Sequence, residues 1–307
     1  MGKIKFIRGG PKELYDSALN EFLKDFIKTP LDVALIVPRP GMATHIRSSL
    51  LAGTTVPLFS VTDLDNIVAY LFDQYETQVG QVSGIGVRNI ILSLLKENVN
   101  EFPHFFNDGK LRDGVVDDLI IMLHTIQDYG ADLSKYQMDD MFPVDIPLLL
   151  SLYQGKLREE GLVDPIGVRL KVASDLDAWC GGRSLFRKLV ILGPFEPTAS
   201  QTAVLRALVR NCDEVIFHHP FVPGSNKVYA QPIIDLAPNT EIIDLPTEER
   251  TVRRALMVRE WSDEAKIDLR PEVSIARFLD PITEARQAAQ RIAQLIRDGT
   301  NAEDIAI

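Results

Sequence analysis

Short apolar runs rich in β-branched residues recur along the chain and predict buried strands of a parallel sheet. They lie at residues 4–7, 33–37, 56–61, 189–192, 215–217, 241–245 and 273–278. Between several of these runs apolar residues return at intervals of three and four, most clearly over residues 15–26, which predicts helices with one buried face. The alternation of strand and helix indicates an α/β fold built on a doubly wound parallel sheet.

This alternation stops between residues 64 and 163, where strand signals are few. Apolar residues keep helical spacing there, as do Val115, Leu119, Met122, Leu123 and Ile126. We therefore predict an all-helical insertion over residues 64–163. The interrupted α/β domain would then comprise residues 1–63 and 164–250.

Residues 270–307 have the pattern of a strand, a helix and the beginning of another strand. Asp280 is placed to cap the helix, Pro281 suits its first position, and Gly299 suits its end. The chain then stops on the apolar residues 305–307, and a strand left there would have backbone groups without partners. We therefore expect the natural chain to continue and residues 270–307 to open a second α/β domain.

The composition limits the partners and the compartment. The 307 residues carry 33 Lys and Arg against 43 Asp and Glu, so the net charge of -10 repels polyanions unless a basic groove forms locally. Cys180 and Cys212 lack the paired spacing of a metal or redox site, which predicts reduced core thiols. The sequence has neither an apolar run long enough for a membrane span nor a signal peptide. We expect a cytoplasmic protein without a membrane partner.

The stretch KIKFIRGGPKELYDSA has the order of a phosphate-binding loop: a strand, the glycine pair Gly9 and Gly10, Lys12 and a helix. A working loop of the form G-x-x-x-x-G-K-[ST] surrounds the phosphates with backbone amides and a lysine, and its hydroxyl binds magnesium. When Lys12 is aligned with that lysine, the positions of the two glycines and the hydroxyl are occupied by Phe6, Pro11 and Glu13.

These replacements act against phosphate binding. Pro11 has no N–H to donate, and Glu13 places a carboxylate at the helix N-terminus, where it satisfies the helix dipole and repels phosphate. We therefore predict that Gly9 and Gly10 form a tight strand-to-helix turn without ATP chemistry. A nucleotide bound in an unusual way is the alternative that stays open.

A second test is the strand that would carry the acids of an ATPase, one for magnesium and one for the attacking water. This strand lies in KLVILGPFEPTASQTAVLRALV, where Gly193 follows the strand and the first acid, Glu196, comes later. Together with Gln201 at the start of the next helix, they form a predicted degenerate acid site. The phosphate loop and the acid site are thus degenerate together.

Basic and hydroxyl side chains gather just beyond the carboxyl end of the predicted strand 33–37, in VPRPGMATHIRSSLL. They are Arg39, His45, Arg47, Ser48 and Ser49. Ligands of open α/β sheets bind at that edge, and these residue types contact phosphates, so single-stranded nucleic acid is a candidate ligand. The alternative is a solvated helix start in which Gly41 and Thr44 serve as turn and cap.

The sequence contains no recognisable catalytic or metal-ligating constellation. The five histidines do not stand at ligand spacing from acids or cysteines, and no serine lies in a nucleophile elbow. His218 and His219 end a predicted strand, where they would either line a ligand site or form a loop pair that caps the sheet. We therefore predict no catalytic residue and no metal ligand in this chain.

Four stretches together carry a family resemblance. They are ALIVPRP, LYQGKLREEGLVDP, LGPFEPTASQTAVLRAL and TEARQAAQRIAQLIRDGTNAEDIAI, and the last two are the most specific. The chain resembles, over nearly its whole length, the B subunit of bacterial ATP-dependent helicase–nucleases of the AddB or RexB type, with an inactivated helicase region. The resemblance implies a RecA-like first domain over residues 1–63 and 164–250, with the helical insertion as its subdomain. It also implies that residues from 270 onward open a second RecA-like domain.

The resemblance further implies a function. The chain would belong to a DNA repair and recombination protein and act as a scaffold and single-stranded DNA guide without ATPase activity, beside a helicase partner subunit. Family members often continue into a PD-(D/E)XK nuclease, sometimes with an iron–sulfur cluster, and neither is found in these 307 residues. No cofactor is expected here. Two rival classes stay open, a nucleotide- or small-molecule-binding α/β enzyme and a pure protein-interaction module.

Overall fold

The computed structural model describes most of the chain. The described residues are 3–50, 60–107, 110–112, 114–131, 145–193, 197–220, 240–246 and 281–300. The chain divides into two compact units, residues 1–259 and 260–307. The predicted strand at 273–278 and the apolar end at 305–307 lie outside the described residues.

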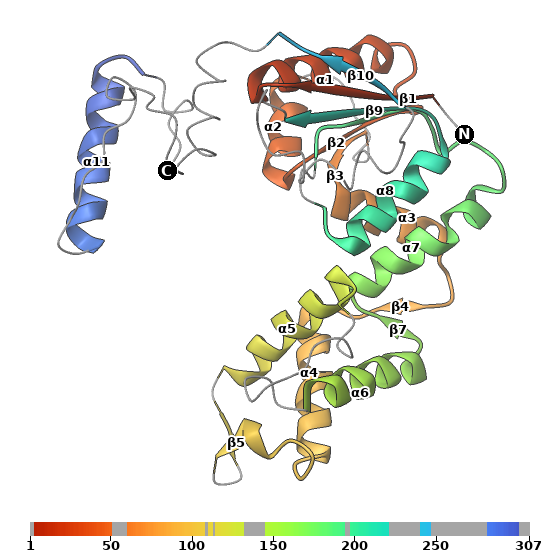
Figure 1. Ribbon diagram of the computed structural model, residues 1–307, viewed down its shortest axis with the longest axis vertical. Helices are drawn as coiled ribbons and strands as arrows, with labels where there is room; N and C mark the ends of the chain where they lie inside the picture. Colours follow the sequence, from red (N-terminus) through yellow and green to blue (C-terminus); the bar gives the residue numbers. More distant parts are fainter. Residues whose placement is uncertain are drawn as a thin grey trace, which may run out of the picture. The chain divides into compact units, whose positions relative to one another are not determined.

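The first unit is built on a sheet of six parallel strands in the order β10-β1-β9-β8-β2-β3 (Figure 1). Their bounds are β1 Lys3–Gly9, β2 Val33–Val37, β3 Val61–Asp63, β8 Phe186–Ile191, β9 Cys212–Pro220 and β10 Glu241–Asp244. The predicted α/β fold with a parallel sheet is confirmed. The order differs from the two common doubly wound orders, because the first strand lies between the last two.

Both faces of the sheet are covered by helices, which explains why its central strands are apolar throughout. On β2, Val33, Leu35 and Val37 face α1 (Pro11–Phe26) and α2 (Pro40–Leu50). The alternate residues Ala34 and Ile36 face the opposite layer. That layer contains α3 (Leu64–Tyr75), α7 (Pro165–Cys180) and α8 (Ala199–Arg210) (Figure 1).

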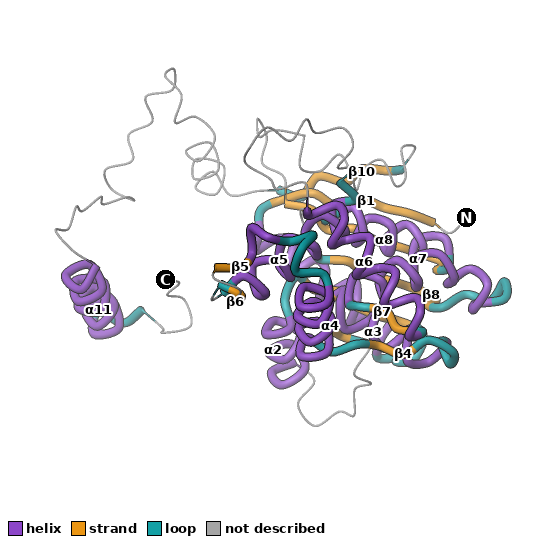
Figure 2. The backbone as a smooth tube through the Cα atoms, turned by 90° about the horizontal axis from the view of Figure 1, so that it is seen from below, coloured by secondary structure: helices purple, strands orange, loops and turns teal. Residues whose placement is uncertain are grey.

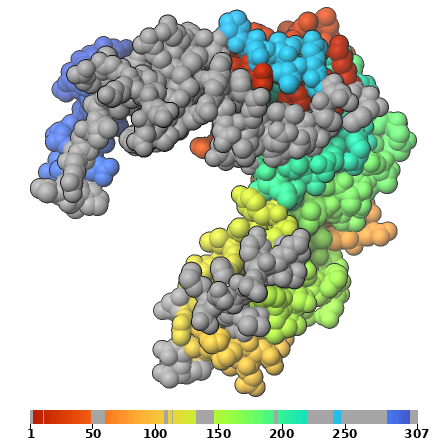
Figure 3. Space-filling view, viewed as in Figure 1, coloured from red at the N-terminus to blue at the C-terminus, as the bar shows by residue number. Residues whose placement is uncertain are grey.

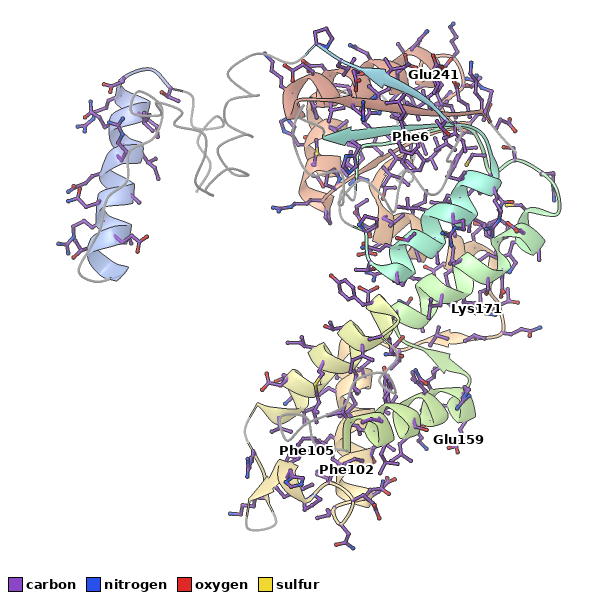
Figure 4. All side chains as sticks on the ribbon, viewed as in Figure 1. Phe6, Phe102, Phe105, Glu159, Lys171 and Glu241 are labelled. Atoms are coloured by element: carbon purple, nitrogen blue, oxygen red, sulfur yellow. The ribbon has the colours of Figure 1, made fainter. Side chains whose placement is uncertain are left out.

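Aromatic stacking links two neighbouring strands inside the second of these layers. Phe6 on β1 and Phe217 on β9 stack with ring centroids 5.1 Å apart (Figure 4). Because β1, β2, β3 and β8 run parallel, their carboxyl ends lie at one edge of the sheet, and a helix follows each of them. Gly9, Arg39 and Gly193, which follow or end β1, β2 and β8, therefore lie at this carboxyl edge.

The helical insertion has a core of its own. Its helices are α4 (Gly84–Glu97), α5 (Val115–Tyr129) and α6 (Asp145–Glu160). The chain enters through β4 (Gly80–Gln81) and leaves through β7 (Leu162–Val163), and these two short strands pair side by side (Figure 2). A 3-10 helix (Pro103–Phe105) and a hairpin of β5 (Phe106–Asn107) and β6 (Lys110–Leu111) complete it, with Phe102 stacked on Phe105 (Figure 4).

The insertion starts later than the predicted residue 64. Helix α3 buries Ile67, Val68 and Leu71 against the sheet, in the same apolar cluster as α7 and α8. The apolar residues of α3 have the same helical spacing as those of the insertion, but they pack against the sheet of the α/β domain. The helical cluster therefore begins at β4, and the remaining domain limits stay predictions.

In the second unit the structure describes one helix, α11 (Pro281–Arg297). The helix ends as predicted at Gly299, whose φ of 94° lies in the left-handed region that glycine favours. The N–H groups of Gly299 and Thr300 donate to the carbonyls of Ile296 and Leu295, at 3.1 and 2.9 Å. The predicted cap Asp280 lies outside the described residues. Across the described parts of both units, no helix is long and apolar enough to cross a membrane.

Candidate functional site at the carboxyl edge of the sheet

The glycine turn after β1 is shaped by packing. Gly9 is buried, and a Cβ placed on it would lie 2.9 Å from Leu245 Cβ. The Leu245 N–H donates to the Arg8 carbonyl at 2.7 Å, so the segment after β10 closes directly over the turn. Gly10 then precedes α1 in an extended conformation, and Pro11 starts the helix. The chain needs a glycine at position 9 for this close approach, independently of any phosphate.

The charged groups around the turn are arranged against an anion. Lys12 is exposed, whereas the Oε2 atom of Glu13 is buried in the first turn of α1 and has no hydrogen-bond partner among the described residues. A carboxylate at this position interacts favourably with the positive end of the helix dipole. Beside it, Arg8 donates two hydrogen bonds to Asp244, at 2.7 and 2.9 Å, and they lower the pKa of that carboxyl group.

The two histidines at the end of β9 are buried parts of the strand. His218 is 2% exposed, its Nε2 lies 3.2 Å from Ser17 Oγ, and burial lowers its pKa to about 4. His219 is buried as well. The interpretation as a loop pair is therefore wrong, because β9 continues beyond its apolar run to Pro220. At neutral pH His218 is an uncharged member of the core.

The second glycine of interest, Gly193, also serves packing. It follows β8 with a φ of 125°, a conformation that side-chain-bearing residues rarely adopt, and a Cβ there would lie 3.0 Å from Pro38 Cγ. Only β9 separates β8 from β1, so the two glycine turns lie about 10 Å apart across the sheet. Glu196, the predicted acid, lies outside the described residues.

Gln201 has a structural task at the start of α8. Its backbone N–H donates to Thr198 Oγ1 at 3.3 Å, and its side-chain oxygen accepts from the Thr198 N–H at 3.1 Å. The two residues thus form a capping box, which satisfies backbone donors that the first helical turn leaves unpaired. The sequence signal T-x-x-Q was present and was not used in the prediction.

A cavity of about 220 Å³ lies between the ends of β2 and β3 and the first turns of α3 and α8. Its polar groups come from Asp63, Asp65, Asn66 and Gln201. Asp63 is itself occupied as the cap of α3, because it accepts hydrogen bonds from Asn66 N at 3.0 Å and from Asn66 Nδ2 at 2.5 Å. Within the described residues, no group of three or more His, Cys, Asp or Glu side chains could hold a metal ion.

An ion-pair network ties the insertion to one wall of this cavity. Arg169 on α7 lies 2.8 Å from an oxygen of Asp65 and 2.9 Å from an oxygen of Asp128 on α5. Asp128 also accepts from Thr198 Oγ1 at 2.8 Å and from Ser200 Oγ. The insertion and the start of α8 are therefore held together by one carboxylate. Periodicity could not reveal this network, since Asp128 and Arg169 are 41 residues apart.

The predicted basic cluster lies on and just before α2. Arg39 lies two residues after the end of β2 and is exposed, as are His45 and Ser48, while Arg47 is half-buried. Arg47 donates to Thr44 Oγ1 at 3.4 Å. Ser49 lies in the last turn of the helix.

The alternative of a turn and cap at the start of this helix is wrong. Helix α2 begins at Pro40, so Gly41 lies within its first turn. Thr44 Oγ1 donates back to the Pro40 carbonyl at 3.2 Å and therefore lies inside the helix. Arg39 therefore lies at the carboxyl edge, between Pro38 and Pro40 in the sequence, whereas Arg47, Ser48 and Ser49 lie in the last turn of α2, away from that edge.

A scan of the sequence against models of protein families finds no match, and a search of curated proteins also finds none. The resemblance to AddB-type subunits therefore remains a prediction that depends on the residues themselves.

Proposed function

We propose that the chain is a RecA-like module without ATPase activity, which serves as a scaffold and guides single-stranded DNA in an AddB-type repair protein. The strand order supports the RecA-like part of the proposal. It places the turn after β1 and the turn after β8 at one edge with a single strand between them. That spacing suits one nucleotide whose phosphates and magnesium would contact both turns.

The main support for the absence of ATPase activity is the close packing of other residues against Gly9 and Gly193. Leu245 closes over Gly9, and Pro38 packs against Gly193. Both glycines therefore have a structural reason to be present in a protein that binds no phosphate there. The buried carboxylate of Glu13 adds a negative charge at the position where phosphate would enter.

The proposal of a DNA guide rests on helix α2. Arg39 is exposed just beyond the end of β2, at the edge where open α/β sheets bind ligands, and His45 and Ser48 are exposed further along α2. Arginine and hydroxyl side chains contact phosphates without reading sequence. A local basic surface of this kind is what a chain with a net charge of -10 needs in order to bind DNA.

The cavity favours the rival class, a small-molecule-binding enzyme, only weakly. Its volume of about 220 Å³ is smaller than the roughly 300–1,000 Å³ of typical ligand sites. Its carboxylates are also committed, Asp63 to the cap of α3 and Asp65 to Arg169. We therefore assign the cavity to the floor of a larger surface site.

Salt-dependent binding of a fluorescein-labelled oligothymidine, measured by fluorescence anisotropy, tests the DNA proposal. Arg39→Ala with Arg47→Ala should weaken binding and lower the slope of log K against log salt by about 1.4, since each lost phosphate contact removes about 0.7 on single strands. The matched control is Lys24→Ala with Lys28→Ala, which removes two exposed cations near the end of α1 at the opposite edge. Equal effects of both pairs, or no binding at low salt, would contradict the proposal.

A further inference from the structure

An exposed aromatic ring ends helix α5. Tyr129 is 63% exposed, and no hydrogen bond or ring contact of its side chain is found within the described residues. By comparison, Tyr75 stacks on Trp179 with ring centroids 5.8 Å apart. A ring of this size left largely in water loses apolar burial that a partner would provide.

The backbone that carries this ring is firmly held. The next residue, Gly130, has a φ of 62° and ends α5, and its N–H donates to the Gln127 carbonyl at 3.1 Å. The preceding residue, Asp128, is fixed by Arg169 and by the hydroxyls of α8. The ring of Tyr129 is therefore presented from a rigid position.

This position adjoins the first turn of α8. Asp128 accepts from Thr198 and Ser200, and a Cβ on Gly130 would lie 3.8 Å from Ala199 Cβ. Figure 3 shows the yellow end of α5 directly against the teal of α8. The same turn of α8 carries Gln201 into the cavity at the carboxyl edge.

We infer that Tyr129 is a stacking platform for a nucleobase of the single strand bound along the carboxyl edge. The inference rests on the proposed function and adds a contact from the insertion. A fixed ring binds a base with little loss of conformational freedom, and every base offers a face on which it can stack. The hydroxyl remains in water while the ring face is covered.

The local charges favour a base over a phosphate at this point. Asp65 and Asp128 lie close to the ring's attachment and repel phosphates, although Arg169 compensates part of their charge. Arg39 lies in the sequence between Pro38 and Pro40, which line the same cavity at the end of β2. Phosphate contacts at Arg39 and base stacking at α5 would therefore act near the end of β2 and beside the start of α8, and both of these elements line the cavity.

Anisotropy titrations with a labelled oligothymidine of about 15 nucleotides test the inference. Tyr129→Ala should weaken binding about tenfold, the usual effect of losing one stacked base, and leave the salt slope unchanged. Tyr129→Phe should bind like the wild type. Ile121→Ala is the matched control, because this side chain is 66% exposed two turns earlier on the same helix. It should have no effect.

An abasic oligonucleotide of the same length separates base stacking by Tyr129 from a purely structural role of this residue. It should bind the wild type and Tyr129→Ala with equal affinity, since it offers nothing to stack. Salt-dependent binding of oligothymidine that is equally tight in wild type and Tyr129→Ala would overturn the inference and leave the proposed function standing. Absence of binding by the wild type at low salt would overturn both. If Tyr129→Ala fails to fold, the test uses the wild type alone. Equal affinity of the wild type for oligothymidine and for the oligonucleotide without bases would then overturn the inference.

Discussion

The carboxyl edge of the sheet is closed beside β1 and open beside β2 and β3. On the closed side Leu245 covers Gly9, and His218 is buried against α1. On the open side Arg39 is exposed next to a cavity of about 220 Å³. The comparison shows that packing alone accounts for the glycine at position 9, while the neighbouring part of the edge leaves a cavity open.

The largest expected loss of stability is at Gly193, which packs against Pro38 between the closed and the open side. Gly193→Ala should lower the free energy of unfolding by about 3–4 kcal/mol, because it combines a strained backbone conformation with a clash against Pro38. Urea unfolding measures this effect. Gly41→Ala is the control, since its added methyl group meets nothing within 4 Å and lies in α2, where alanine should stabilise by about 0.5–1 kcal/mol. Equal effects at both positions would show that packing does not hold this boundary.

Lowering the pH should destabilise the folded protein through His218, which is buried on the closed side. Burial lowers the pKa of His218 from 6.5 to about 4, so between these pH values the unfolded chain binds a proton that the folded chain excludes. Its contribution is therefore complete above pH 6.5 and falls by about 3 kcal/mol as the pH drops toward 4. His218→Gln should flatten this part of the stability profile, measured by urea titrations between pH 4 and 7. A profile with unchanged slope would contradict the burial of a neutral imidazole.

The closure over the phosphate-like turn can be tested at Gly9 itself. Gly9→Ala should cost about 2 kcal/mol, because its new Cβ would lie 2.9 Å from Leu245 Cβ. In a chain that already carries Leu245→Gly, the same substitution should cost much less. A double-mutant cycle measured by thermal unfolding gives this coupling. A coupling near zero would mean that Leu245 does not close the turn.

The smallest effect is expected for the ion pair on the same side. Asp244→Asn should cost about 0.5–1 kcal/mol at low salt and less at high salt, because the Asp244 side chain is 60% exposed. The measurement is the free energy of unfolding at two ionic strengths. A much larger, salt-independent loss would indicate that the pair is a main element of the closure.

The sequence predicted the sheet well because its signals are local. The run 33–37 coincides with β2, since a strand buried on both faces is apolar throughout. The run 241–245 contains β10, although this edge strand is exposed and not buried as predicted. The position of α3 against the sheet could not be predicted, because helical spacing shows that a helix has an apolar face but not which element that face packs against. The prediction ended β9 before His218 because histidine is polar. In the structure the strand continues to Pro220, and His218 is buried as a neutral imidazole.

The candidate site was predicted in part. Arg39 lies at the carboxyl edge, because the carboxyl ends of parallel strands share one side of the sheet, whereas Arg47 and Ser48 lie at the far end of α2. Their role in ligand binding stays a prediction. Asp128 and Arg169 were missed, since their pairing depends on how two distant helices meet. The approach of Leu245 to Gly9 became visible only in three dimensions, and the prediction that this turn has no ATP chemistry stays a prediction.

The most direct test of the central claim is the melting temperature of the protein measured with magnesium and ATP and, separately, with single-stranded oligothymidine. A ligand present at 100 times its Kd stabilises the folded state by about 2.7 kcal/mol, which raises the melting temperature by several degrees. We predict no shift with magnesium and ATP and a clear rise with the oligonucleotide at low salt. A rise with magnesium and ATP and none with the oligonucleotide would contradict the account.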